Sequence, residues 1–344
     1  MRKRLGVLLA ALFYYSGLVG LFRWLARSSG QRLMILNYHR ASGGDLCRHM
    51  MYLRRHYRIL PIEDALEEIY ACDGKKIQRR DRRTPLVLTF DDGYHDCYTH
   101  AFKLACQLQV PITIFLIPGY IESGNIFWWE EGNHLVACTQ VDQVTLDQCT
   151  YHLTQPDQRA ALAQMIQHRL SATRSIKERE TLLAAMRRGL GVPGKLAGDI
   201  TKEAINRSLT WEEIDMMWES GWVSFGAHTM NHPVLSHLAD PAELRYEVQA
   251  CRAVLEQRLG CPIRTFAYPV GKPENIGDQT IKAVREAGFV WAVTTTCGDV
   301  TPQSEPLRLE RLLTDVSRHW LVLAAETSGI WKFFSPVWKR VIGP

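Results

Sequence analysis

Short apolar runs alternate with longer amphipathic stretches along most of the chain. Most of these runs are bounded by Gly, Pro, Asp or Asn, which is typical of strands buried on both faces of a parallel sheet. The predicted core strands are Leu33–Leu36, Tyr57–Leu60, Leu86–Phe90, Val110–Ile117, Trp222–Ala227, Ile263–Ala267 and Phe289–Thr294. Because helical patterns separate most of them, the sequence predicts a parallel α/β architecture, either a barrel or a doubly wound sheet.

The clearest helix signals lie between Asp240 and Gly260. Asp240 can cap the helix, Pro241 suits its first turn, and Glu243 completes a capping-box arrangement. Gly260 ends the helix. Its apolar stripe consists of Leu244, Val248, Cys251, Leu255 and Leu259. The other predicted helices are Leu46–His56, Ile62–Ala71, His95–Gln109, Trp211–Ser220 and Asp278–Ala287.

One region departs from this alternation. From about residue 141 to residue 220 the chain is mostly polar and helix-prone, with apolar residues at helical spacing such as Leu162, Ile166 and Leu170. We interpret it as an inserted helical subdomain within one catalytic domain of residues 31–320. The 344 residues, 46% of them hydrophobic, suffice for one large domain or two modest ones, and no low-complexity linker divides them.

The charge and the cysteines narrow the class of protein. The formal net charge is only +5 and rests partly on the arginine-rich N-terminus and on Lys75–Arg83, so no nucleic-acid partner is expected. The nine cysteines are an odd number and form no Cys-x-x-Cys pair. This argues against a zinc ribbon and against a secreted disulfide framework, and unpaired thiols favour a reducing compartment.

Both ends of the chain carry apolar segments. Met-Arg-Lys-Arg precedes Leu5–Phe22, which has eighteen residues without a charge. No clear cleavage site follows, so residues 1–27 are predicted to be an uncleaved signal or a membrane anchor, which could also lie in the interface because of residues such as Trp24. Residues 321–344 form an amphipathic aromatic tail, a second interfacial candidate. For both segments the alternative is a helix packed on the domain.

Two adjacent carboxylates follow one of the predicted strands. Asp91 and Asp92 come directly after Leu86–Phe90, and Gly93 allows a sharp turn there. The carboxyl end of a parallel strand is where open sheets and barrels place their chemistry. Side-by-side carboxylates repel, so one of them is expected to bind a cation or to keep a proton. The alternative is a surface turn.

Two histidines follow another strand. His228 and His232 are four residues apart and come just after Trp222–Ala227. With 12 histidines in 344 residues, chance alone predicts about 0.4 such pairs, so the spacing is weak evidence by itself. Because the ends of parallel strands share one edge, these histidines can meet one of the two carboxylates there. One carboxylate and two imidazoles, with coordination positions left open, are typical of a catalytic metal site.

Three motifs occur in a fixed order. They are Thr-Phe-Asp-Asp-Gly at 89–93, His-Thr-x-x-His-Pro at 228–233, and Arg-x-Phe-Ala-Tyr-Pro-x-Gly at 264–271. This order resembles the central motifs of the NodB-type polysaccharide deacetylases, carbohydrate esterase family four, over roughly residues 85–313. The resemblance implies a distorted parallel (β/α) barrel, and a divalent metal that serves the removal of N- or O-acetyl groups from sugars.

The resemblance also implies roles for individual residues. Asp91 matches the general base, and Asp92, His228 and His232 match the metal ligands. The metal is expected to be zinc, with cobalt or nickel as alternatives. A cation there would polarise the acetamide carbonyl and acidify a water molecule, whose proton Asp91 would accept.

Three further roles rest on the same resemblance. Arg264 matches the arginine that pairs with the base, and Tyr268 matches the residue whose backbone N–H holds the oxyanion. The C-terminal Leu-x-His motif that supplies the acid in common family members is missing. Instead, Ile35–Arg40 resembles the N-terminal segment of a subgroup in which the acid histidine follows the first strand, so His39 is expected to protonate the leaving amine. The alternative is a structural histidine.

The predicted function is the removal of N-acetyl groups from an amino sugar in a polysaccharide or a lipid-linked glycan. Trp128 and Trp129 are candidates for stacking on a sugar, or else they belong to the core. The alternative functions are a related amidohydrolase acting on a non-sugar C–N bond and a non-catalytic glycan-binding relative. The protein is expected at the cytoplasmic membrane of a bacterium, in exopolysaccharide biosynthesis, on a side that the sequence leaves open.

Overall fold

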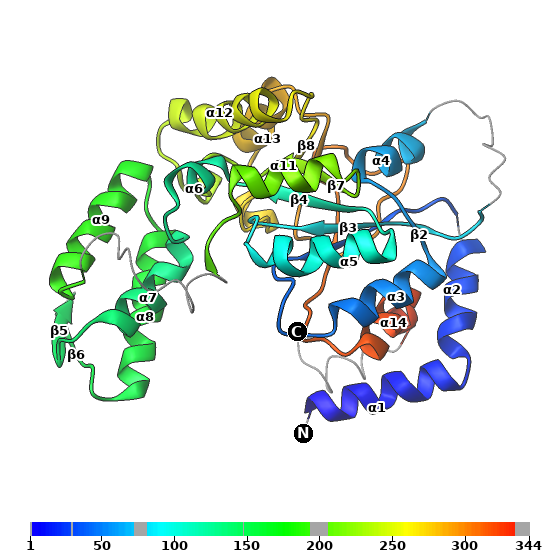
Figure 1. Cartoon of the computed structure of the whole chain (residues 1–344), viewed down its shortest axis with the longest axis horizontal. Coiled ribbons are helices and arrows are strands. Elements are labelled where there is room, and N and C mark those ends of the chain that lie inside the picture. The colour runs from blue at the N-terminus through cyan, green and yellow to red at the C-terminus, as the bar shows by residue number, and fades with distance from the viewer. Residues whose placement is uncertain (1, 29, 72–80, 147, 193–205, 334–344) are drawn as a thin grey trace.

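An eight-stranded parallel sheet forms the centre of the computed structural model, which describes residues 2–28, 30–71, 81–146, 148–192 and 206–333 (Figure 1). The strands are β1 (Met34–Tyr38), β2 (Arg58–Ile59), β3 (Pro85–Phe90), β4 (Ile112–Leu116), β7 (Val223–Ala227), β8 (Thr265–Ala267), β9 (Trp291–Val293) and β10 (Leu312–Leu313). Their order is β10-β1-β3-β4-β7-β8-β9, with β2 beside β3. Each of the seven predicted runs overlaps one of these strands, whereas the two-residue β10 was not predicted.

The segment before β10 closes the sheet into a barrel. Val293 of β9 forms a parallel bridge with Leu309, and Leu36 of β1 pairs in parallel with Leu312. The backbone N–H of Leu309 donates to the carbonyl of Ala292 over 2.8 Å. The chain from 306 to 313 therefore runs between β9 and β1. The predicted distorted parallel (β/α) barrel is confirmed, and the doubly wound alternative is wrong.

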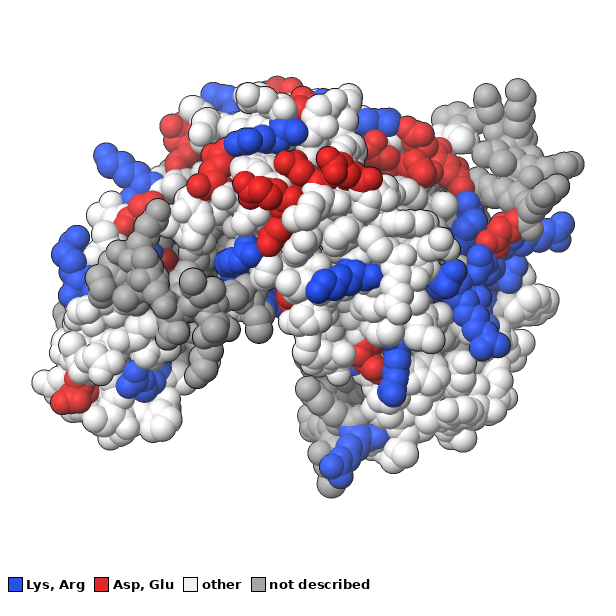
Figure 2. Space-filling view, viewed as in Figure 1, with Lys and Arg blue, Asp and Glu red and all other residues white. Residues whose placement is uncertain are grey.

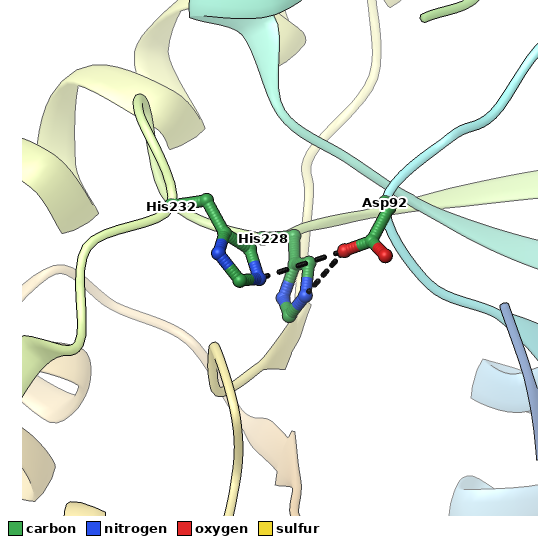
Figure 3. A group of neighbouring side chains, drawn as sticks. All are labelled: Asp92, His228 and His232. Atoms are coloured by element: carbon green, nitrogen blue, oxygen red, sulfur yellow. Dashed lines mark ion pairs between the residues drawn. The ribbon is translucent and has the colours of Figure 1, made fainter. Parts of the chain in front are cut away.

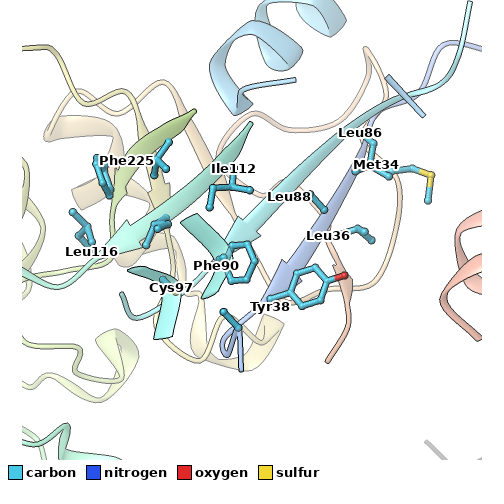
Figure 4. Close-up of a cluster of buried hydrophobic side chains, with 14 of the residues drawn as sticks. Met34, Leu36, Tyr38, Leu86, Leu88, Phe90, Cys97, Ile112, Leu116 and Phe225 are labelled. Atoms are coloured by element: carbon cyan, nitrogen blue, oxygen red, sulfur yellow. The ribbon is translucent and has the colours of Figure 1, made fainter. Parts of the chain in front are cut away.

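Alternate residues of each strand point to the inside and the outside of this barrel. The inner cluster includes Ile35, Val87, Phe115, Val293 and Leu309, and helix α4 (Ile62–Tyr70) packs against it. Gly226 leaves room for the ring of Phe115 in this inner cluster, because a Cβ atom at residue 226 would lie 2.5 Å from that ring. The outer cluster lies under the surrounding helices; its labelled members in Figure 4 are Met34, Leu36, Tyr38, Leu86, Leu88, Phe90, Cys97, Ile112, Leu116 and Phe225.

Helices cover the outer surface of the barrel. They are α3 (Leu46–His56), η1 (Cys97–Phe102) with α5 (Lys103–Leu108), α6 (Pro118–Ser123), α11 (Trp211–Glu219), α12 (Pro241–Leu259) and α13 (Asp278–Glu286), with short 3-10 turns at Leu235–His237 and Pro273–Asn275. The predicted signals of α12 are confirmed in part. Asp240 accepts from the N–H of Ala242, Gly260 has a φ of 65°, and the apolar stripe is buried. Glu243 instead accepts from the N–H of Ile176, so the capping box was wrong.

A separate lobe stands beside the barrel, on the left of Figure 1. It contains α7 (Trp128–Cys138), the antiparallel hairpin of β5 (Gln143–Leu146) and β6 (Cys149–His152), α8 (Pro156–Ser171) and α9 (Ile176–Gly189) around a hydrophobic cluster of its own. The lobe overlaps the residues expected to form a helical insertion, about 141 to 220, but it begins earlier, with α7, and includes a hairpin. Helix α11 packs on β7 and η1 and belongs to the barrel.

The terminal helices lie together on one side of the barrel. They are α1 (Arg2–Tyr15), α2 (Leu18–Ser28), α14 (Trp320–Ser328) and α15 (Ile330–Phe333). Tyr14 contacts Trp320 with ring centroids 5.1 Å apart, and Phe13 contacts Trp331 at 5.3 Å. Most of α14 is buried, and residues 334–344 of the expected tail lie outside the described residues. Within the described chain no single helix is long and apolar enough to cross a membrane, although α1 and α2, bent by 72°, pass that test as a pair by length and composition.

Candidate active site

The carboxyl ends of β3 and β7 bring the acidic and imidazole side chains together. The N–H of Asp91 donates to the carbonyl of Tyr38, so β3 remains paired with β1 up to that residue. Asp92 then adopts a φ of 70° and Gly93 a φ of 65°, and the chain turns away from the sheet. Such backbone geometry is uncommon for a residue with a Cβ atom. The turn aims the carboxylate of Asp92 across the barrel mouth toward His228.

Asp92, His228 and His232 form a compact buried group (Figure 3). The Nε2 atoms of His228 and His232 lie 3.4 Å and 3.5 Å from Oδ1 of Asp92, and the three ligand atoms all lie within 4.8 Å of one another. Ligands bound tetrahedrally to zinc at about 2.0–2.1 Å are separated by about 3.3–3.4 Å. Both the donor types and their spacing therefore fit a divalent metal.

Contacts with the surrounding protein fix the ring of His228 and the backbone of His232. The carbonyl of Ala267 can only accept a hydrogen bond, so Nδ1 of His228, 2.7 Å away, carries the proton and leaves Nε2 for a metal. The N–H of His232 donates to the hydroxyl of Thr229 over 2.9 Å. Thr229 and His232 have φ values of 65° and 54°, so this loop is held in a strained conformation.

The two histidines differ in how readily they take up a proton. Burial and, to a lesser degree, the neighbouring His228 lower the pKa of His232 to about 3, so this ring is neutral and its nitrogens can act as ligands. Burial, the largest single effect, lowers the pKa of His228, but the hydrogen bond with Asp92, the negative charges of Asp91 and Asp92 and the hydrogen bond to Ala267 together raise its pKa overall. A metal can bind His228 only when Nε2 has no proton, so the metal and a proton compete there.

Asp91 is held by Arg311 rather than by Arg264. Arg311 is fully buried and donates from Nη1 and Nη2 to the two carboxylate oxygens of Asp91, both over 2.8 Å. Asn37 donates to Oδ2 of Asp91 over 3.1 Å. Burial alone would raise the pKa of Asp91, but the Arg311 guanidinium holds it well below its usual range. The carboxylate is therefore ionised and oriented, as a general base must be.

The predicted pairing of Arg264 with Asp91 was wrong. Arg264 precedes the first residue of β8, whereas Asp91 follows the carboxyl end of β3, so the two lie toward opposite ends of their strands. Arg264 instead pairs with Glu63 and Glu67 of α4, at 3.4 Å and 2.6 Å. One sequence signal could have identified Arg311: it continues the alternation of Leu307 and Leu309, both buried, so a charge falls on the buried face of a strand.

The predicted oxyanion contact of Tyr268 is also not found. The backbone N–H of Tyr268 donates to the carbonyl of Val293 over 3.2 Å, because it continues the pairing of β8 with β9 by one residue. Its phenol donates to the carbonyl of Leu307 over 3.0 Å, and the side chain is buried. Tyr268 thus fixes the segment that leads to Arg311.

His39 lies at the mouth of the barrel, directly after β1. Its side chain is exposed, and its positive charge, when present, lowers the pKa of Asp91 and of Asp92. Asp315 is affected in the same way. His39 is therefore close to the base and to the candidate metal ligands, and its acid role stays a prediction.

The adjacent tryptophans contribute differently to the site. Trp128 is buried, and its Nε1 donates to the carbonyl of His232 over 2.8 Å. It is therefore a core residue that supports the loop carrying His232. Trp129 is half-buried, and its ring centroid lies 4.3 Å from that of His232. Its Nε1 donates to the hydroxyl of Tyr94 over 2.6 Å. Of the two, Trp129 is the one placed to offer a ring face beside the candidate ligands.

Comparisons with known proteins agree with this arrangement. Residues 78–292, more than half of the chain, match the family model described as polysaccharide deacetylase. The chain therefore belongs to the polysaccharide deacetylase family, as its motifs predict. No curated protein matches the chain.

Solved structures show the same fold at low sequence identity. IcaB from Ammonifex degensii is 18% identical with a TM-score of 0.55, and the match covers 87% of this chain and 98% of that chain. The deacetylase PplD of Streptococcus pyogenes, in complex with acetate, is 16% identical with a TM-score of 0.52, covering 83% and 93%. The deacetylase domain of BpsB from Bordetella bronchiseptica is 14% identical with a TM-score of 0.51, covering 83% and 97%.

Metal binding should stabilise the folded protein through this site. We expect Zn²⁺, added to chelator-treated protein at about 100 times its dissociation constant, to raise the free energy of unfolding by about 2.7 kcal/mol. Asp92→Ala and His232→Ala should abolish this gain, because each removes a ligand. Thermal unfolding and elemental analysis of bound metal measure both effects. The exposed Asp215→Ala is the matched control, and a full metal response in Asp92→Ala would contradict the site.

Proposed function

We propose that the protein is a metal-dependent hydrolase that removes N-acetyl groups from an amino sugar of a polysaccharide or of a lipid-linked glycan. The observation that carries this proposal is the convergence of Asp92, His228 and His232 beside Asp91, a base that Arg311 keeps ionised. Membership of the polysaccharide deacetylase family supports a carbohydrate substrate. A half-buried Trp129 beside the ligands supports binding of a sugar ring.

Each residue of the site has a separate role in the proposed amide hydrolysis. A divalent metal bound there, zinc or alternatively cobalt or nickel, would polarise the acetamide carbonyl and make a water molecule more acidic. Asp91 accepts the proton of the attacking water, because it is ionised and lies next to the ligand Asp92. Arg311 and Asn37 keep its carboxylate in one orientation throughout. His39 then donates a proton to the departing amine, which must leave as a neutral group.

Two alternatives to sugar deacetylation predict different results. A related amidohydrolase acting on a non-sugar C–N bond would use the same residues but would not release acetate from glycans. A non-catalytic glycan-binding relative has no need for an ionised, buried base beside three candidate ligands, so the intact set of Asp91, Asp92, His228 and His232 disfavours it.

The proposed place of action is the cytoplasmic membrane of a bacterium, in exopolysaccharide biosynthesis. Support for membrane attachment comes from the apolar helices α1 and α2, which have no acidic residue. A membrane-attached enzyme could reach either a polymer or a lipid-linked amino sugar.

Acetate release tests the proposed function directly. Purified protein should release acetate from N-acetylated glucosamine oligomers or from lipid-linked N-acetyl sugars. A chelator should stop the reaction, and excess Zn²⁺ or Co²⁺ should restore it. Enzymatic detection of acetate, with Asp91→Asn as the inactive control, measures this. A metal-loaded, folded protein that releases no acetate from either kind of glycan would contradict the proposal.

The acid role of His39 predicts a specific loss of turnover. Replacing His39 by Ala or Gln should lower kcat by about 10²–10⁴-fold, because the leaving amine would no longer receive its proton from a positioned group. Bound metal and thermal stability should stay unchanged, because His39 is exposed and is not a ligand. The exposed His100→Ala is the matched control. Turnover near that of the wild type would show that another group is the acid.

Replacing Arg311 by Met should lower stability and kcat far more than replacing Arg264 by Met. Arg311→Met leaves the buried Asp91 charge uncompensated, so we expect a stability loss of about 3–5 kcal/mol and a large fall in kcat. Arg264→Met breaks a partly exposed pair worth about 0–1 kcal/mol, and kcat should hardly change.

Arg311→Lys separates the charge of Arg311 from its geometry. Lys keeps the positive charge but cannot bind both oxygens of Asp91 in parallel, so kcat should recover only in part while bound metal stays normal. Thermal unfolding, metal analysis and acetate release together measure these effects. Loss of activity in Arg264→Met with an active Arg311→Met would restore the original assignment.

A further inference from the structure

Helix α1 is apolar on two opposite sides. Gly6 and Ala10 are buried, and Phe13 and Tyr14 are half-buried where they meet the C-terminal helices. These positions are three or four residues apart and form one face of the helix. An ordinary surface helix would have polar residues on the opposite face. In α1 that face is apolar as well.

The exposed side of the two N-terminal helices forms what we call the outward face. It consists of Leu5, Leu8, Leu12 and Tyr15 on α1, and of Leu21, Trp24 and Leu25 on α2. Leu8, Leu12 and Tyr15 are 66%, 61% and 76% exposed. Within the described residues, these seven are nearly half of the 15 large hydrophobic side chains that are exposed. Such a concentration marks an interaction surface rather than the scattered exposure that is normal for soluble domains.

The charged residues of α1 and α2 all have one sign. Helices α1 and α2 contain five basic residues and no acidic one, and the basic side chains of Arg4 and Arg27 are exposed beside the apolar ones. In the view of Figure 2 the lower right of the molecule, where Figure 1 places α1, is mostly uncharged surface with a few Lys and Arg and a small acidic group. An apolar strip with a basic margin is complementary to a bilayer that contains anionic lipids.

The geometry opposes a single transmembrane span. The 14 residues of α1 and the 11 of α2 extend over about 21 Å and 17 Å, less than the roughly 30 Å of a hydrocarbon core. The two helices meet at a bend of 72°. The inward side of α1 is attached to Trp320 and Trp331 of the barrel domain, so α1 cannot enter a bilayer lengthwise without breaking these contacts.

We infer that α1 and α2 bind the surface of an anionic membrane by laying the outward face into one leaflet, while the inward face remains on the barrel domain. This rests on the membrane attachment in the proposed function and specifies its mode, an in-plane helix pair instead of a spanning anchor. A second copy of the chain is the competing occupant. It is disfavoured because a twofold interface apposes identical patches, which would bring basic residues against basic residues.

Vesicle binding tests this inference. The full chain should sediment with vesicles of phosphatidylcholine and phosphatidylglycerol, bind at least tenfold more weakly to phosphatidylcholine alone, and be released by an alkaline carbonate wash. Leu8→Glu/Leu12→Glu should reduce binding at least tenfold, because charged side chains would enter the acyl region. Met216→Glu/Tyr246→Glu, which changes exposed apolar residues on α11 and α12, is the matched control and should bind like the wild type.

Each other outcome overturns the inference in a recognisable way. Retention after the carbonate wash would show a spanning anchor. A dimer in solution that Leu8→Glu/Leu12→Glu converts to a monomer, without vesicle binding by the wild type, would show that a second copy covers the face. Acetate release from soluble oligomers should be the same in Leu8→Glu/Leu12→Glu and the wild type, so failure of the membrane contact is separable from failure of the proposed chemistry.

Discussion

The buried pair of Asp91 and Arg311 is the interaction on which the rest of the site depends. Removing two charges from water costs several kcal/mol per ion, and their attraction compensates only when the geometry is good and further hydrogen bonds are made. Here Arg311 binds both oxygens of Asp91 and donates from Nε to the carbonyl of Thr294 over 2.7 Å, while Asn37 donates to Asp91. Asp91 follows β3, and Arg311 belongs to the segment that closes the barrel. The pair thus links the closure of the barrel to the ionisation of Asp91. A neutral pair of similar volume could close the barrel but would leave no charged carboxylate beside the candidate ligands.

Most of the strands could be predicted because their signal is local. A buried strand of a parallel sheet is an apolar run bounded by turn residues, whatever its partners are, so the runs at Leu86–Phe90 and Val110–Ile117 identify β3 and β4. Strand β10 has two residues and is defined by its pairing with β1, and the chain before it is placed by the bridge of Leu309 to Val293. No local window contains either contact. The hairpin of β5 and β6 was missed for a related reason, since its residues are mostly exposed and belong to a polar, helix-prone region.

The candidate metal ligands were predicted correctly as a group, whereas the partner of Asp91 was not, and the reason is geometric. Asp92, His228 and His232 follow predicted strands directly, so the shared edge of a parallel sheet brings them together as soon as the strands are right. Arg264 was assigned from its motif alone, although it precedes the first residue of β8 and shares the alternation of Phe266, whose side chain packs outside the barrel. Strand direction and alternation argued against that pairing. The same reasoning, applied to the run from Leu307 to Leu313, places Arg311 on the inward side.

The inserted lobe helps to hold the loop that carries His232, one of the candidate ligands. The loop from Thr229 to His232 has two residues with positive φ, and such strain persists only when neighbouring groups hold it. The carboxylate of Glu247, on α12 of the barrel, accepts from the N–H and from Nδ2 of Asn231, both over 2.7 Å. From the lobe, Trp128 on α7 donates to the carbonyl of His232, and Arg179 on α9 donates to the carbonyl of Asn231 over 3.0 Å. The loop is therefore held between two independently packed bodies, so a shift of the lobe would move His232 relative to Asp92. Since the lobe also carries Trp129, the same contacts set the position of this ring relative to the candidate ligands, so the insertion is part of the geometry of the candidate site.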